Sequence, residues 1–257
     1  MKLSILKSGF WISFILIIIA SWVYIYNMSV SMGFDLLGQN IMSTNMKAMD
    51  MSSIANFKML LPMWSIMMVA MMLPAMIPTF ITYQDLIKSY EGSWEGWIGI
   101  LIGYIFIWIF FSLNISILQT FLQKWQFLNN QGILKSNWIT VFLLIAVGSF
   151  QFTQIKNYCH RVCASPFIYF MKKWRSGFIG GIKMGLGLGF FCVGCCWGFM
   201  SLAFIMGYMN FIWMGLITFI VILEKIPEIG KLIKKPLGIL ILLIAIYLML
   251  DNFLNFL

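Results

Sequence analysis

Long apolar runs constrain this chain more than any other feature of its sequence. Of its 257 residues, 61% are hydrophobic and 10% are charged. Several runs reach roughly 20 apolar residues, which is the length a helix needs to cross a hydrocarbon core. With this composition, a soluble domain would have too few polar residues to cover its surface. Because lipid admits only helices and closed barrels, and barrel strands would alternate in hydropathy, the pattern predicts an all-α polytopic helical membrane bundle.

The runs predict about seven transmembrane helices in one integral membrane domain, residues 1–257. The expected spans cover 10–26, 60–82, 97–122, 138–158, 178–207, a short helix ending near 224, and 237–250. Lys and Arg are concentrated in the N-terminal segment and in the loops expected on the same side of the membrane as the N-terminus. The positive-inside rule therefore places the N-terminus on the cytoplasmic side. We therefore expect a multi-pass protein of the cytoplasmic membrane, embedded in the lipid bilayer. The net charge of +9 is interpreted as a topology signal and not as nucleic-acid binding.

Three of the five cysteines lie in one apolar run, at Cys192, Cys195 and Cys196. On a helix these positions are i, i+3 and i+4, so the thiols would share one face. Converging thiols at membrane depth suit a soft metal ion or a redox site. Glycines in the same run are equally typical of a close helix crossing through small residues. Spacing alone leaves both interpretations open.

The other two cysteines, Cys159 and Cys163, stand at i, i+4 near the end of the preceding span, close to the expected cytoplasmic face. One five-thiol site or two separate sites would both fit. Sites of two or three thiolates suit Cu(I), whereas a structural zinc site would be expected to show paired CxxC spacing. We interpret His160, beside a basic loop, as a surface residue, and Glu224, after an apolar run, mainly as an interfacial one. A role for Glu224 as counter-charge or proton acceptor is the less favoured alternative.

Methionine is concentrated between residues 42 and 76, in the loop 27–58 and in the following helix. Pro74 should kink that helix unless a neighbour satisfies the carbonyl that loses its donor. Met thioethers bind Cu(I), but Met is also a flexible packing residue, so both roles stay open. Two ridges at i, i+4 spacing run along the helix: Met63, Met67, Met71 and Met68, Met72, Met76.

Three sequence blocks resemble a family of predicted metal-binding integral membrane proteins of bacteria and archaea, classed as a domain of unknown function. The first block is the Met-rich run 64–78, the second is 154–166 with its CxxxC spacing, and the third begins at Gly189 with CxGCCW and continues to Lys225. The resemblance covers a core of about 60–225 and implies metal binding without a defined reaction. Ala164 stands where the family usually has an arginine, so no role for that arginine is expected here.

We therefore interpret the chain as a soft-metal protein, most simply for copper(I), that transports the ion or delivers it to a membrane or extracytoplasmic cuproenzyme. No catalytic residue is assigned, and no haem, flavin or nucleotide is expected, although an enzyme is not excluded. The alternatives are a membrane thiol oxidoreductase using the pairs Cys159/Cys163 and Cys195/Cys196, or a structural subunit of a larger membrane complex. The candidate metal ligands are Cys192, Cys195, Cys196, Cys159, Cys163, Met63, Met67, Met71, Met68 and Met72.

Overall fold

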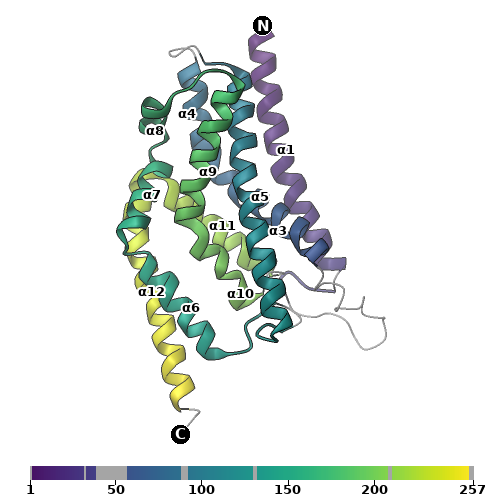
Figure 1. The fold of residues 1–257 in the computed structure, drawn as a ribbon, viewed down its shortest axis with the longest axis vertical. Coiled ribbons are helices and arrows are strands. Elements are labelled where there is room, and N and C mark those ends of the chain that lie inside the picture. The colour runs from purple at the N-terminus through teal and green to yellow at the C-terminus, as the bar shows by residue number, and fades with distance from the viewer. Residues whose placement is uncertain are drawn as a thin grey trace.

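The computed structural model describes residues 2–31, 33–38, 57–87, 92–129, 132–207 and 210–254, and over these ranges it is built from helices. The all-α prediction is therefore confirmed. The methionines expected in the loop 27–58 at positions 42–51 lie outside the described residues. Figure 1 shows the elements, which are α1 (Lys2–Ser31), α3 (Phe57–Met72), η1 (Pro74–Met76), α4 (Ile77–Ile87), α5 (Trp94–Lys124), α6 (Asn137–Phe150), α7 (Gln154–Ala164), α8 (Pro166–Lys173), α9 (Gly177–Ser201), α10 (Ala203–Met206), α11 (Phe211–Lys225) and α12 (Pro227–Leu254).

Within the described ranges, five helical segments are long and apolar enough to cross a membrane. A sixth is obtained if α6 and α7, which are bent by 63° at their junction, form one broken span. The expected count of seven is not confirmed. The difference lies in α11, whose 15 residues extend only about 22 Å at 1.5 Å per residue. The long apolar helices make this a multi-pass membrane protein.

The helices α5 and α9 form the tightest crossing, and glycine makes it possible. A Cβ on Gly181 would lie 2.2 Å from the carbonyl oxygen of Gly96, and one on Gly185 would lie 2.2 Å from that of Ile100. Both distances are far below van der Waals contact, so the two backbones touch directly, as small residues permit in membranes. The helix-crossing interpretation of the glycines is thus confirmed. It does not exclude a thiol site, because Cys192, about two turns after Gly185, also faces α5, where its Sγ lies 3.2 Å from the Tyr104 hydroxyl.

Pro74 interrupts the Met-rich helix, even though a neighbouring side chain satisfies the freed carbonyl. The helix α3 ends at Met72, and the 3₁₀ turn η1 separates it from α4. Pro74 has no N–H to give to the carbonyl of Ala70, four residues earlier. That carbonyl instead accepts a hydrogen bond of 3.1 Å from Nε1 of Trp22 on α1. The break is therefore stabilised by a donor from another helix.

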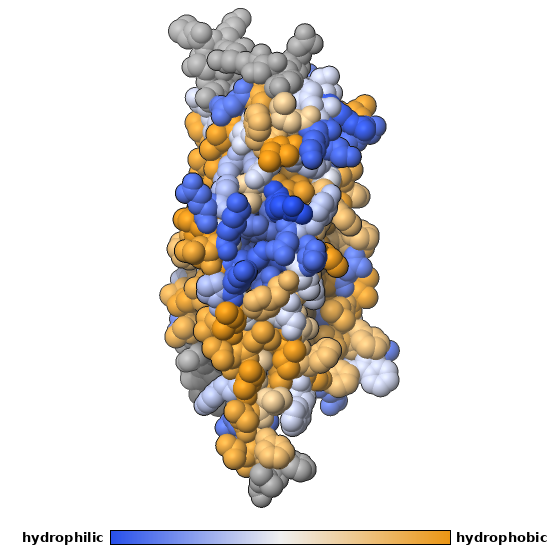
Figure 2. Space-filling model, turned by 90° about the vertical axis from the view of Figure 1, so that its left-hand side faces the viewer, coloured by the Kyte–Doolittle hydropathy of each residue, from blue (hydrophilic) through white to orange (hydrophobic). Residues whose placement is uncertain are grey.

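The helices α7, α11 and α12 meet near the middle of the long axis of the molecule (Figure 1). Figure 2 shows that hydrophilic residues gather at about this height on one side, with a mainly apolar surface below them. Exposed charged residues of these helices include Arg161 on α7 and Lys231 and Lys235 at the start of α12. The apolar remainder of α12 packs along α6. This junction of three helices holds the candidate site.

Candidate metal centre

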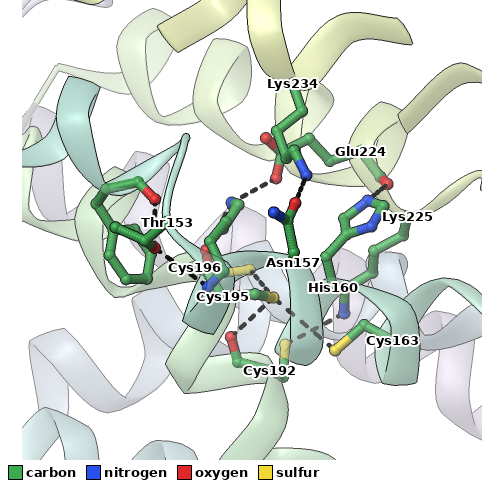
Figure 3. A network of polar contacts seen from close by, with 12 residues as sticks. Thr153, Asn157, His160, Cys163, Cys192, Cys195, Cys196, Glu224, Lys225 and Lys234 are labelled. Atoms are coloured by element: carbon green, nitrogen blue, oxygen red, sulfur yellow. Dashed lines mark hydrogen bonds and ion pairs between the residues drawn. The ribbon is translucent and has the colours of Figure 1, made fainter. Parts of the chain in front are cut away.

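A compact thiol cluster joins α7 to α9. The Sγ atoms of Cys163, Cys192 and Cys195 all lie within 4.8 Å of one another, and all three residues are buried. Cys195 Sγ is 3.8 Å from Cys163 Sγ. It is also 3.2 Å from the Sγ of Cys196, which adds a fourth sulfur beside the three (Figure 3). The expectation that the thiols of α9 share a face is confirmed.

The structure also decides how the second cysteine pair relates to the first three. The helix α7 packs against α9, and this brings Cys163 into the cluster. Cys159 lies one helical turn earlier, and it is not a member of the three-thiol group. A Cβ on Gly194 would be 3.0 Å from Cys159 Sγ, so Cys159 packs on the backbone of α9. Of the pair Cys159 and Cys163, only Cys163 therefore belongs to the three-thiol group.

Two polar side chains contact the sulfur of Cys192. Lys225, the last residue of α11, places its Nζ 3.2 Å from Cys192 Sγ. The hydroxyl of Tyr104 on α5 is also 3.2 Å from this sulfur. Both residues are buried, and the Lys225 ammonium lies 5.9 Å from the centre of the Tyr104 ring. Cys192 is thus held by a cation and a hydroxyl within the protein interior.

A buried ion pair stands directly behind the cluster. Lys156 Nζ on α7 is 2.8 Å from Glu224 Oε2, and the two side chains are 0% and 3% exposed. The same ammonium donates a 2.7 Å hydrogen bond to the carbonyl of Cys195 and lies 4.7 Å from the centre of the Phe199 ring. Buried charges are tolerated only when they are paired and hydrogen-bonded. Lys156 therefore ties α7, α9 and α11 together at the thiols.

Two sequence interpretations are corrected here. His160 is only 5% exposed, and its Nε2 lies 2.6 Å from the carbonyl oxygen of Glu224, so it is not a surface residue. Glu224 is only 2% exposed and pairs with Lys156, so it takes the counter-charge role that was the less favoured alternative. The start of α12 makes this packing possible, because a Cβ on Gly230 would lie 2.0 Å from the Glu224 carbonyl oxygen. Both residues belong to the buried junction.

The predicted methionine ligands line a buried helix. Met63, Met67, Met68, Met71 and Met72 are each at most 4% exposed, and α3 packs against α1, α5 and α11. A connection to the thiols runs through Tyr104, whose hydroxyl lies 3.4 Å from the Met72 carbonyl oxygen as well as 3.2 Å from Cys192 Sγ. The end of the Met-rich helix is therefore one side chain away from the cluster.

Sequence reasoning did not assign three of these residues. Lys156 and Lys225 did carry a signal, because ionisable residues inside membrane segments mark functional sites by default. Because both lysines stand at the ends of apolar runs, they were counted among the loop charges that indicate the topology. Tyr104 gave no signal, since an aromatic residue in an apolar helix is ordinary. Its role depends on how α5 is placed against α9.

Residues 61–248 match the model of a family, PpoB2, described as copper chaperone. The chain belongs to this copper chaperone family. The matched region begins in α3 and ends in α12, so it contains the thiol cluster, Tyr104 and the Lys156–Glu224 pair. Neither the curated proteins nor the solved structures gave a match. Membership of a copper chaperone family, together with the cysteine cluster, supports copper binding.

Proposed function

We propose that this protein binds Cu(I) within the membrane on Cys163, Cys192 and Cys195 and passes the ion to a membrane or extracytoplasmic cuproenzyme. The observation that carries the proposal is the approach of these three sulfurs, from two different helices, to within 4.8 Å of one another. Thiolates select soft ions such as Cu(I), and copper is the metal named in the description of the family. The copper is cargo, so the site must hold it and also release it.

The spacing of the sulfurs fits a three-coordinate ion. With metal–sulfur bonds of about 2.3 Å, as in zinc thiolates, a trigonal site places its sulfurs about 4 Å apart. The 3.8 Å distance between Cys163 Sγ and Cys195 Sγ agrees with this geometry. The 3.2 Å distance from Cys195 Sγ to Cys196 Sγ is shorter than that spacing. Cys196 is therefore suited to replace one ligand while the ion is handed on.

The charges around the cluster also suit a monovalent ion. Two thiolates, one thiol and Cu(I) carry a net formal charge of minus one, and the ammonium of Lys225 on Cys192 Sγ brings the total to zero. Lys156 is already neutralised by Glu224. Because an uncompensated charge is costly in a low-dielectric interior, a neutral assembly is favoured. A divalent ion would reach the same neutral total only with all three thiols ionised.

Copper content of the purified protein tests the proposal. The full chain in detergent or lipid nanodiscs is loaded with Cu(I) under reducing, anaerobic conditions and analysed for metal. We expect Cys192→Ser and Cys195→Ser to lose bound copper. Cys159→Ser is the matched control, since Cys159 is a neighbouring buried cysteine outside the three-thiol group. Equal copper in the parent protein and in the Cys192→Ser/Cys195→Ser variant would refute the proposal.

A thiol oxidoreductase is the second candidate, because Cys163 and Cys195 are close enough to form a disulfide after a small movement. This pair differs from the pairs expected from the sequence. Forming the disulfide would pass two electrons and two protons to an acceptor such as a quinone, which becomes a quinol. Titration of thiols in metal-free protein distinguishes the two functions. Reversible loss of two thiols on adding a quinone would favour the enzyme, and unchanged thiols would favour copper handling.

A further inference from the structure

A cavity of about 280 Å³ lies between the end of α1 and the start of α3. Three methionines line it, Met28 on α1 and Met59 and Met63 on α3, together with Tyr24 and Lys58. Its exposure differs along the wall, because Met59 is 50% exposed at the opening whereas Met63 is only 4% exposed. The cavity therefore leads from the surface to the first buried methionine of α3.

We propose that this cavity is a second soft-metal site, in which Cu(I) binds the thioethers of Met28, Met59 and Met63 before it reaches the thiols. The inference rests on the proposed function, since it names the place where the ion is loaded. It also assigns two ligands, Met28 and Met59, that lie outside the thiol cluster and outside the buried ridge.

The chemistry of the wall supports a soft ion. Methionine usually fills irregular gaps in a core, and Met63 and Met28 do pack in or against the core. All three methionines nevertheless border the cavity, so packing fills only part of their surroundings. Among the described residues that line the cavity there is no carboxylate and no imidazole. Hard divalent ions prefer oxygen ligands, whereas thioethers select Cu(I).

The position of Met63 connects the cavity to the rest of the protein. Met63, Met67 and Met71 follow one another at single-turn intervals along α3, roughly 6 Å per step, and all three are buried. The helix ends at Met72, whose carbonyl is joined through Tyr104 to Cys192. Neutral thioethers bind Cu(I) more weakly than thiolates do, so an ion loaded at the cavity moves toward tighter ligands.

Protection from oxidation tests the site in the unmodified protein. The full chain in nanodiscs is treated with hydrogen peroxide, with and without excess Ag(I), a redox-inert substitute for Cu(I), and sulfoxides are mapped by mass spectrometry. We expect Ag(I) to protect Met28 and Met59. Met171 on α8, which is 48% exposed and distant in sequence, is the control and should oxidise equally in both samples. Equal oxidation of Met28 and Met59 with and without Ag(I) would overturn the inference.

A variant tests whether the cavity loads the thiols. In Met28→Leu/Met59→Leu, which conserves side-chain volume, transfer of Cu(I) from a chelator to the cysteines should be slower than in the parent. The amount of copper finally bound by the cysteines should not change, and Met171→Leu should behave like the parent. Transfer at the parental rate would overturn the inference while leaving the thiol site intact. Failure of the thiol site is recognised separately, by copper that remains after Cys192→Ser/Cys195→Ser.

Discussion

The ammonium nitrogen of Lys225 lies 3.2 Å from the sulfur of Cys192, and both residues are buried. A cation in contact with a sulfur in a low-dielectric interior stabilises the thiolate form of that sulfur and any anionic complex built on it. Lys225 is placed at the C-terminus of α11, next to Glu224, which binds the other buried lysine. The end of α11 thus supplies Lys225, which contacts Cys192, and Glu224, which pairs with Lys156.

Removing the Lys225 charge should weaken copper binding. We expect Lys225→Met to lower Cu(I) affinity by about 10- to 100-fold, the usual effect of losing a group that contacts a metal ligand. Competition against a chromogenic Cu(I) chelator measures this change. Lys225→Arg keeps the charge and should retain most of the affinity. If the Lys225→Met and Lys225→Arg variants bind Cu(I) with equal affinity, the charge of Lys225 does not contribute to copper binding.

The Lys156–Glu224 pair should act as a unit in stability. Lys156→Met leaves a buried carboxylate without its partner, and removal of one member of a buried pair costs about 3–5 kcal/mol. The double variant Lys156→Met/Glu224→Gln should recover part of this loss, because no unpaired charge remains. Thermal unfolding in detergent compares the two variants. A double variant less stable than Lys156→Met would contradict this account.

The Tyr104 hydroxyl should matter for copper and not only for folding. Tyr104→Phe removes its contacts with Cys192 Sγ and the Met72 carbonyl, so we expect weaker Cu(I) binding. Tyr169→Phe is a matched control, since that hydroxyl donates to the Met184 carbonyl at 3.0 Å. Burial raises the pKa of Tyr169 to about 12, so it stays a donor at neutral pH. A loss of copper affinity equal in both variants would point to a general packing effect.

The crossing of α5 and α9 should tolerate no added side chain. Gly181→Ala would place a methyl group 2.2 Å from the Gly96 carbonyl oxygen, and overpacking of this kind costs about 1–3 kcal/mol. Gly215→Ala on α11 is the control, because a Cβ there meets nothing within 4 Å. Thermal unfolding measures both variants. Equal melting temperatures would show that the two backbones are not in direct contact.

The sequence alone determined the features that depend on local spacing. Runs of apolar residues required helices in lipid, Pro74 favoured a kink in the Met-rich helix, and i, i+3 spacing required Cys192 and Cys195 to share a face. Each of these follows from covalent geometry within one helix. Local spacing could not decide whether Cys159 or Cys163 joins the metal site, since both stand on one short helical segment.

Only the tertiary structure decided which residues share the site. The packing of α7 on α9 chose Cys163 over Cys159, and the close approach of α11 buried Glu224 against Lys156 and set Lys225 on Cys192. It also buried His160 beneath the start of α12. These contacts join residues between 29 and 68 positions apart, and no periodicity in the chain encodes them. They follow from how whole helices pack, because a charge enters lipid only where another helix brings its partner.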